Sequence, residues 1–296
     1  MWYSSSLLNP FRSAKYIWFS LAMQIKRQRA EREFEGIRRG DRQECWCGGK
    51  LAPFEWHPGF GVCIECGCYV NQHPPMPSEL GRLYSLELYW HTRQKLKGFP
   101  TLEHRTEYDA SDGRLNRWLN VVERYGPVNG RVVEIGCGHG VLLKALKQRG
   151  YECVGVEPDR RVAAWTQQRT GVDMRVGLFP DVKLPSCDLL MAFDVLEHSP
   201  YPNVFLQEAA KLLHPRGMAI FQTPIDHHDS CPPFSGSFAN VFDDLEHQYV
   251  FTSESLEKLI KSVGMEIVAR ATGVRKDDIV ALRKRQGQLR EHSPVD

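Results

Sequence analysis

Short apolar runs alternate with amphipathic stretches through the second half of the chain. Runs rich in valine, leucine and isoleucine predict buried strands, and stretches with apolar residues three or four positions apart predict helices between them. The predicted strands span 131–135, 152–156, 172–176, 188–193, 217–222, 265–270 and 278–283, and the predicted helices span 139–149, 160–169, 203–213 and 253–263. Such alternation is typical of an α/β fold, here a doubly wound, seven-stranded parallel sheet with helices on both faces.

The first predicted strand ends in a glycine-rich turn, Gly136-Cys137-Gly138-His139-Gly140, and a leucine-rich helix follows. Glycines let the backbone turn sharply and let a ligand approach without a Cβ in the way. Glu134 stands just before the turn, where a carboxylate would repel a pyrophosphate but suit a cationic amino-acid head. The second strand runs into Glu157-Pro158-Asp159, and an acidic residue at that position suits the hydroxyls of a ribose.

The third and fourth strands end in further candidates. Phe179 follows the third strand and could stack on an adenine ring or belong to the core. The fourth strand runs into Asp194-Val195-Leu196-Glu197-His198-Ser199-Pro200. Asp194 could hold a cofactor amino group, and His198 could move a proton or only brace the loop. Because ligands of such sheets bind beyond the carboxyl ends of the strands, we expect these residues to share one site with the glycine turn.

Together, the stretches E-I-G-C-G-H-G, V-G-V-E-P-D and D-V-L-E-H resemble the motifs of class I methyltransferases that depend on S-adenosylmethionine (SAM). The resemblance covers roughly residues 130–283 and implies a Rossmann-like methyltransferase sheet. It also implies that Glu134, the glycine turn, Glu157 and Asp194 hold SAM. A dinucleotide cofactor is the rival, but its site needs G-x-G-x-x-G, whereas the spacing here is G-x-G-x-G.

Five of the nine cysteines cluster near the N-terminus, in Cys45-Trp46-Cys47-Gly48-Gly49 and Cys63-Ile64-Glu65-Cys66-Gly67-Cys68. Two cysteine pairs, each followed by glycine and separated by a hairpin-sized spacer, are typical of a zinc ribbon, in which four thiolates surround Zn²⁺. We predict Cys45, Cys47, Cys63 and Cys66 as the ligands of a structural zinc ion, with Cys68 in reserve. A segment so short and poor in aliphatic residues would hardly fold without a metal.

Residues 224–250 form a long insertion between a strand and a helix, and loops of this length usually have a function. The insertion leads into Glu246-His247-Gln248-Tyr249-Val250-Phe251-Thr252, which resembles deoxysugar C-methyltransferases that also carry an N-terminal zinc module. That resemblance implies proton abstraction by Glu246 and His247, with His198 as a further candidate. Asp244 stands where that family has a tyrosine, so we expect O-methylation of a saccharide hydroxyl in preference to C-methylation.

A catalytic divalent metal is a rival use of the same groups. Asp194, Glu197, His198 and His247 resemble the E-x-x-E-H plus distal histidine arrangement of some metal-dependent O-methyltransferases. The resemblance implies a metal that polarises the acceptor hydroxyl. D-V-L-E-H also occurs in methyltransferases that use no metal, so both mechanisms stay open.

Composition narrows the choice of partners and location. A net charge of +2 and a cysteine-rich segment with a single lysine and no arginine disfavour nucleic acid. No apolar run reaches the roughly 18 to 20 residues of a membrane span, and the N-terminus lacks a secretory pattern, so we expect a cytoplasmic protein. Aromatic and basic residues within 1–40 predict a helix that either contacts the inner face of an anionic membrane or packs on the protein.

The chain is therefore expected to divide into a helical tail (1–43), a zinc-ribbon-like module with its linker (44–77), a helical cap (78–128), the SAM-binding domain (129–286) and a disordered tail (287–296). The expected function is methyl transfer from SAM to a small-molecule or glycan acceptor. Alternatives are a sugar C-methyltransferase, an RNA methyltransferase whose zinc module contacts RNA, and a non-enzymatic SAM-binding scaffold. The sequence carries no signal for an oligomeric state.

Overall fold

The computed structural model describes residue 32 and residues 36–226, 241–273 and 278–285. Most of the predicted N-terminal helix, most of the insertion and the C-terminal tail lie outside the described residues. Within the described part of the chain, no helix is long and apolar enough to cross a membrane.

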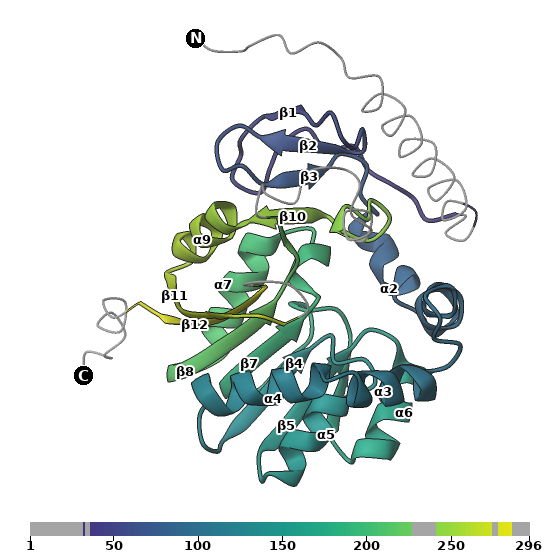
Figure 1. Ribbon diagram of the computed structural model, residues 1–296, viewed down its shortest axis with the longest axis vertical. Helices are drawn as coiled ribbons and strands as arrows, with labels where there is room; N and C mark the ends of the chain where they lie inside the picture. The colour runs from purple at the N-terminus through teal and green to yellow at the C-terminus, as the bar shows by residue number, and fades with distance from the viewer. Residues whose placement is uncertain (1–31, 33–35, 227–240, 274–277, 286–296) are drawn as a thin grey trace.

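A seven-stranded sheet forms the centre of the molecule, in the order β11-β12-β8-β7-β4-β5-β6 (Figure 1). Neighbours from β8 to β6 run parallel, whereas β12 is antiparallel to both β8 and β11. The prediction of a doubly wound, seven-stranded α/β fold is confirmed, but the expectation of a parallel sheet is wrong at β12. The last two strands run antiparallel because their connection is too short for a crossover. The strands are β4 (Arg131–Ile135), β5 (Glu152–Glu157), β6 (Asp173–Val176), β7 (Cys187–Phe193), β8 (Leu213–Gln222), β11 (Met265–Ala271) and β12 (Ile279–Lys284).

Successive residues of each central strand face opposite sides of the sheet, so each strand contributes to two cores. Val132 packs with α4 (Arg114–Tyr125) and α5 (Val141–Gln148), whereas Val133 packs with α7 (Pro202–Leu212) and α9 (Ser253–Ser262). This division explains why the central strands read as continuous apolar runs, since both faces are buried. The helix α6 (Arg160–Thr170) covers the β5–β6 end of the sheet.

A helical cap precedes the first central strand. It consists of η1 (Pro77–Glu79), α2 (Leu80–Leu83), the π-helical segment η2 (Leu86–Gln94), α3 (Leu102–Ser111) and α4. The cap helices are interrupted at Ser85, whose hydroxyl accepts a hydrogen bond from the Leu88 amide and starts a new helix. They are interrupted again where α3 ends at Ser111 and Gly113 (φ 86°) leads into α4.

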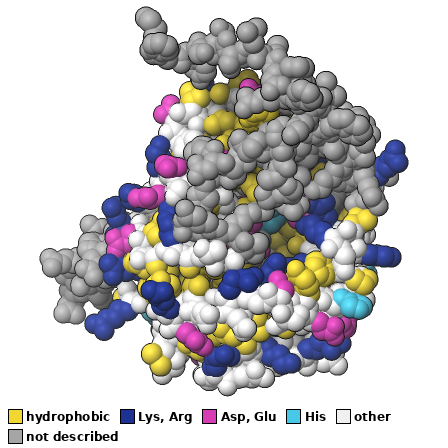
Figure 2. Space-filling model, viewed as in Figure 1, with side chains coloured by type: hydrophobic (Ala, Val, Ile, Leu, Met, Phe, Trp, Pro, Cys, Tyr) yellow, Lys and Arg dark blue, Asp and Glu magenta, His cyan; other side chains and the backbone are white. Residues whose placement is uncertain are grey.

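A second sheet of five strands joins two distant parts of the chain, in the order β1-β2-β3-β10-β9. The cysteine-rich segment supplies β1 (Leu51–Pro53), β2 (Phe60–Cys63) and β3 (Tyr69–Asn71). The segment after the insertion supplies β10 (Tyr249–Thr252), which pairs antiparallel with β3 and parallel with β9 (Ile225–Asp226). Figure 1 shows this sheet above the central sheet. On the face shown in Figure 2, basic and acidic side chains are interspersed over the described surface.

Candidate functional site

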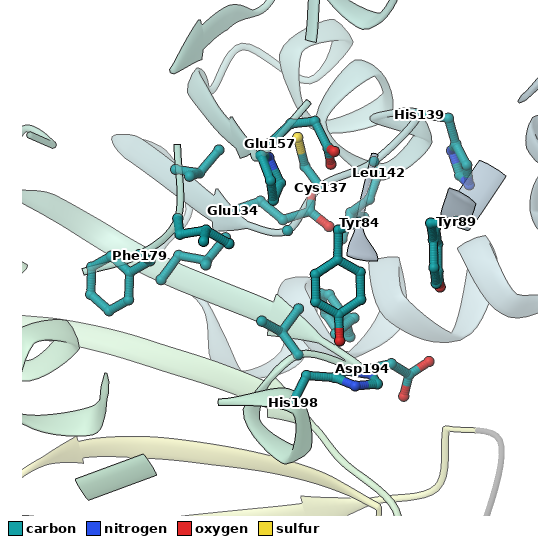
Figure 3. A pocket seen from close by; sticks show the side chains of 18 of the residues that line it. Tyr84, Tyr89, Glu134, Cys137, His139, Leu142, Glu157, Phe179, Asp194 and His198 are labelled. Carbon is teal, nitrogen blue, oxygen red and sulfur yellow. The ribbon is translucent and has the colours of Figure 1, made fainter. Parts of the chain in front are cut away.

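A cavity of about 220 Å³ lies at the carboxyl ends of β4, β5 and β7, beneath the helical cap (Figure 3). Glu134, Cys137 and Glu157 lie on one side of it, and Asp194 and His198 lie on the other. All the residues predicted to bind the cofactor line this cavity except Gly140, which instead precedes α5 as its N-cap. The predicted lining residues are Glu134, Gly136, Cys137, Gly138, Glu157, Pro158, Phe179 and Asp194.

The two glutamates at the strand ends are buried, with 5% of Glu134 and 4% of Glu157 exposed. Burial raises the pKa of each carboxyl to about 8. Glu134 Oε2 has no hydrogen-bond partner among the described residues, and Glu157 accepts a hydrogen bond from the Asp159 amide at 3.3 Å. A buried polar atom without a partner is costly, so the cavity suits a ligand that brings hydrogen-bond donors or a positive charge to these carboxylates.

Neighbouring side chains hold the glycine turn from both sides. At Gly136 (φ 69°), an added Cβ would lie 2.7 Å from the Val195 side chain. At Gly138 (φ 50°), it would lie 3.0 Å from the ring of Trp90, on η2. Only glycine satisfies both the backbone conformation and the space at these positions. The turn is therefore packed between the loop after β7 and the helical cap.

Asp194 begins the loop after β7 in a left-handed conformation (φ 56°), which is uncommon for a residue other than glycine. Gln222 holds it there: the Gln222 amide group donates to Asp194 Oδ1 at 2.8 Å, and the Asp194 amide donates to the Gln222 carbonyl at 2.9 Å. Strained backbone of this kind is concentrated at functional sites.

Phe179 follows β6, lines the cavity and packs edge-on against Phe205, with ring centroids 4.9 Å apart.

Among the candidate bases, His198 lines the cavity directly. Its Nδ1 lies 3.1 Å from the carbonyl oxygen of Glu246 and must therefore carry the proton, which leaves Nε2 as an acceptor. Burial and the neighbouring His247 lower the pKa of His198 to about 4, so the ring is neutral at pH 7. The ring of Tyr84 packs edge-on against it at 5.6 Å.

Glu246 and His247 lie behind His198 and do not line the cavity. The His247 ring is 4.8 Å from that of His198, and its Nδ1 donates to the Val241 carbonyl at 2.7 Å. Burial lowers the pKa of His247. Burial alone would raise the pKa of Glu246, but Lys97 and Arg93 hold it below its ordinary value. Glu246 is thus the counter-ion of two cap residues.

The Glu197, His198 and His247 side chains form a group that could hold a metal ion, since one ligand atom from each lies within 4.8 Å of the others. Two imidazoles and a carboxylate suit several divalent metals. Asp194, the first residue of the resembled metal motif, is not a member of this group.

Sequence patterns did not single out Tyr84 or His139 for the site. The Tyr84 hydroxyl is buried, has no partner among the described residues, and points toward Asp194 and His198 in Figure 3. His139, in the glycine turn, contacts Asp109 of α3 at 2.9 Å, and Asp109 also pairs with Arg105 and Arg114. No periodicity could have found these contacts, because they depend on how the cap lies over the sheet.

The predicted zinc ligands converge where the turn before β1 meets the turn between β2 and β3. The sulfurs of Cys45, Cys47, Cys63 and Cys66 all lie within 4.8 Å of one another, and Cys45–Cys66 and Cys47–Cys63 are 3.6 and 3.5 Å apart. Sulfurs at about 2.3 Å from one Zn²⁺ would be separated by about 3.8 Å, so the spacing fits a tetrahedral thiolate site. Cys68 differs, because its thiol donates to the Val250 carbonyl at 3.4 Å.

The fold and the cavity define an α/β enzyme that binds a cofactor at the carboxyl edge of its sheet. A family model described as a methyltransferase domain matches residues 102–270, and the chain belongs to this family of class I, SAM-dependent methyltransferases. The predicted enzyme class and the prediction of SAM as cofactor are confirmed.

Proteins similar to this chain include O-methyltransferases of ubiquinone biosynthesis. The protein of Pseudomonas fluorescens (strain Pf-5) is 23% identical over 218 residues, which cover 69% of this chain and 86% of that protein. The protein of Agrobacterium fabrum (strain C58) is 28% identical over 219 residues, covering 67% and 84%.

Solved structures with the same fold include the mitomycin 7-O-methyltransferase MmcR, with a TM-score of 0.50 and 18% identity over 62% of this chain. Human N-acetylserotonin methyltransferase, solved with SAM, has a TM-score of 0.50 and 16% identity over 62% of this chain. The likeness spans 57% and 54% of these two proteins and supports the fold alone.

Proposed function

We propose that this protein transfers a methyl group from SAM to a hydroxyl of a small-molecule acceptor, with His198 as the group that takes the proton. One observation carries the proposal: a neutral imidazole with an unprotonated Nε2 lines the same cavity as two buried carboxyls. The carboxyls suit a cationic methyl donor with ribose hydroxyls, and the imidazole suits an acceptor that must lose a proton.

The chain's own residues supply binding and alignment. Bound SAM supplies an electrophilic methyl group on a sulfonium. Glu134 would accept from its amino group, Glu157 from its ribose hydroxyls, and Phe179 would lie beside its adenine. The helical cap excludes water, and His198 would accept the hydroxyl proton as the oxygen becomes a nucleophile.

A saccharide hydroxyl, in glycan or polysaccharide biosynthesis, is our first choice of acceptor, because of the resemblance around Glu246 and His247. The aromatic side chains of Tyr84, Tyr89 and Trp90 line the cavity, and Tyr84, whose ring packs against His198, would contact a sugar ring. A phenolic hydroxyl is the second choice, favoured by the relatives named for ubiquinone biosynthesis and by the same aromatic wall. C-methylation of a sugar stays a narrower alternative.

Methyl incorporation from labelled SAM into separate pools of nucleotide sugars, glycans, phenols and RNA tests this proposal. We expect label in a saccharide pool, with mass spectrometry of the product placing the methyl on oxygen. Label in phenols would replace the saccharide while keeping the reaction class. A methyl group on carbon would favour the sugar C-methyltransferase, and label in RNA would favour the RNA methyltransferase. Label in no pool would favour the non-enzymatic SAM-binding scaffold.

The same assay separates a metal mechanism from an imidazole base. If Glu197, His198 and His247 hold a divalent metal, turnover should stop with a mild chelator that leaves the cysteine site loaded and return with Mg²⁺ or Mn²⁺. If His198 acts alone, chelation should have no effect. Catalysis by His247 with Glu246, a cytoplasmic location and membrane contact through residues 1–40 stay predictions.

A further inference from the structure

We infer that Asn71, in the cysteine-rich module, is a positioning residue for the imidazoles at the acceptor side of the cavity. The module would thus be part of the active-site framework as well as a zinc-binding unit. This inference rests on the proposed function, because it assigns a purpose to the segment 243–248 that carries His247 and supports His198.

The Asn71 side chain is fully buried and uses both ends of its amide group. Its Nδ2 donates to the carbonyls of Asp244 and His247, both at 2.8 Å, and its Oδ1 accepts from the His73 amide at 2.9 Å. Its backbone amide donates to the Gln248 carbonyl at 3.0 Å. One residue of β3 therefore holds the segment 243–248 at three points, the carbonyls of Asp244, His247 and Gln248.

That segment in turn holds the residues at the cavity. The Glu246 carbonyl accepts the Nδ1 proton of His198 and so determines which nitrogen of that ring faces the cavity. The Gln248 amide donates to the Glu197 carbonyl at 2.8 Å, which ties the segment to the loop after β7. A shift of 243–248 would therefore move His247 directly and would reorient His198.

Aromatic packing reinforces this contact between the module and the segment. Phe242, just before the segment, is 2% exposed and lies among rings of the cysteine-rich module. Its ring centroid is 5.1 Å from Phe54, 5.4 Å from Phe60 and 5.0 Å from Tyr69. Interlocked aromatic contacts of this kind define one arrangement, so the module and the segment should order each other.

The cysteine site lies directly beside β3. The Cys63 amide donates to the Cys68 carbonyl at 2.8 Å, and Cys68 precedes Tyr69, the first residue of β3. Four thiolates on one Zn²⁺ would hold the turn at 63–68, which leads into β3, against the turn at 45–49, which leads into β1. The route from the metal site to the cavity is therefore short: the turn at 63–68, β3, Asn71 and then 243–248.

Asn71→Leu tests the inference, because leucine has a similar volume and no donor. We expect amide hydrogen exchange in 243–248 to accelerate and kcat to fall, each by about tenfold or more, since two buried carbonyls lose their donor. The SAM dissociation constant should stay within about twofold, since one hydrogen bond lost far from the donor side changes that affinity little. The zinc content should stay unchanged.

Tyr69→Phe is the matched control. It lies on the same strand and is also buried, but its hydroxyl donates to Asp226 rather than to the segment 243–248. We expect normal exchange in 243–248 and normal kcat. If Asn71→Leu does not fold, Asn71→Ser replaces it, because serine keeps a donor that is too short to reach both carbonyls.

The exchange measurement needs no acceptor, so it separates this inference from the proposed function. Faster exchange in 243–248 without any detectable turnover would overturn only the proposed function. Exchange in Asn71→Leu equal to that of Tyr69→Phe would overturn the inference, as would faster exchange with an unchanged kcat. Removal of zinc with a thiol-directed reagent should accelerate exchange in the same segment.

Discussion

At the end of β4, Glu134 lies where its own charge is disfavoured. In the unfolded chain this carboxyl ionises near its ordinary pKa, whereas burial raises the pKa in the folded protein to about 8. The folded protein therefore keeps a proton that the unfolded chain releases between these pH values, so the stability of the ligand-free protein falls as pH rises through that window. A cationic ligand would reverse the preference and draw the proton off.

Glu134→Gln should consequently stabilise the ligand-free protein and weaken SAM binding at once. At pH 8 we expect the unfolding free energy to rise by on the order of 2 kcal/mol, or a Tm about 5 °C higher, with SAM affinity at least about tenfold lower. At pH 4 the variant and the parent should have similar Tm values. Equal Tm values at pH 8 would contradict the burial of an ionisable group at this position.

His198 gives a second prediction at the same scale. Because burial and His247 lower the pKa of His198 to about 4, the ring stays unprotonated, and so able to accept a proton, well below its ordinary pKa. We expect kcat to be flat from pH 8 down to about 5 and to fall only below that. His198→Gln should reduce kcat by about 10² or more without changing SAM affinity. A kcat that falls near pH 6.5, or an active His198→Gln variant, would remove this residue from the mechanism.

At the scale of elements, most central strands and helices could be predicted closely, because burial on both faces of the sheet leaves a clear apolar signal, but β8 begins at Leu213 rather than at the predicted residue 217. The strand predicted at 131–135 is β4 (Arg131–Ile135), and the helix predicted at 253–263 is α9 (Ser253–Ser262). The break at Ser85 depends on a single side-chain hydrogen bond, which helical periodicity does not reveal. The pairing of β3 with β10 joins segments far apart in sequence and leaves no local pattern.

Arg93, on η2, links the cap to the segment 243–248 through buried ion pairs with Asp243 and Glu246. Arg93→Met should cost about 3–5 kcal/mol of unfolding free energy, because Asp243 would lose this ion pair and Glu246 would keep only Lys97, whose Nζ lies 3.7 Å away. Arg283→Met, which removes an exposed pair with Glu266, is the control and should cost about 1 kcal/mol or less. Chemical denaturation measures the unfolding free energy of both variants. Similar losses in the two would show that the buried Arg93 pairs contribute no more stability than an exposed pair.

At the scale of the whole molecule, the cysteine-rich module and the methyltransferase domain share one hydrophobic core, which includes Cys66, Val133 and Phe251 of β10. Cys47→Ser removes one of the four sulfurs of the metal site, the one whose cysteine is exposed. We expect bound zinc to fall from one ion per chain to a small fraction, and Tm to fall by about 10 °C or more. Elemental analysis and calorimetry measure both, and a parent protein without zinc would refute the site.

The cofactor side of the site could be predicted from the sequence, because its residues follow predicted strands. Glu134, the glycine turn, Glu157 and Asp194 follow strands in sequence, so the strand pattern was enough to bring them to one edge of the sheet. Tyr84, Asp109 and Arg93 reach the cavity or its support from the cap, whose placement over the sheet is a tertiary property. The sequence indicated Glu246 and His247 only through a family resemblance, and their position behind His198 depends on the β3–β10 pairing.

Titration calorimetry with SAM and NAD tests the central claim most directly, because it requires no knowledge of the acceptor. We predict that SAM and its demethylated product bind to one site per chain, that binding near pH 7 releases protons from the buried carboxyls, and that Glu157→Gln weakens it. NAD should give no heat. Binding of NAD with no response to SAM would contradict the account.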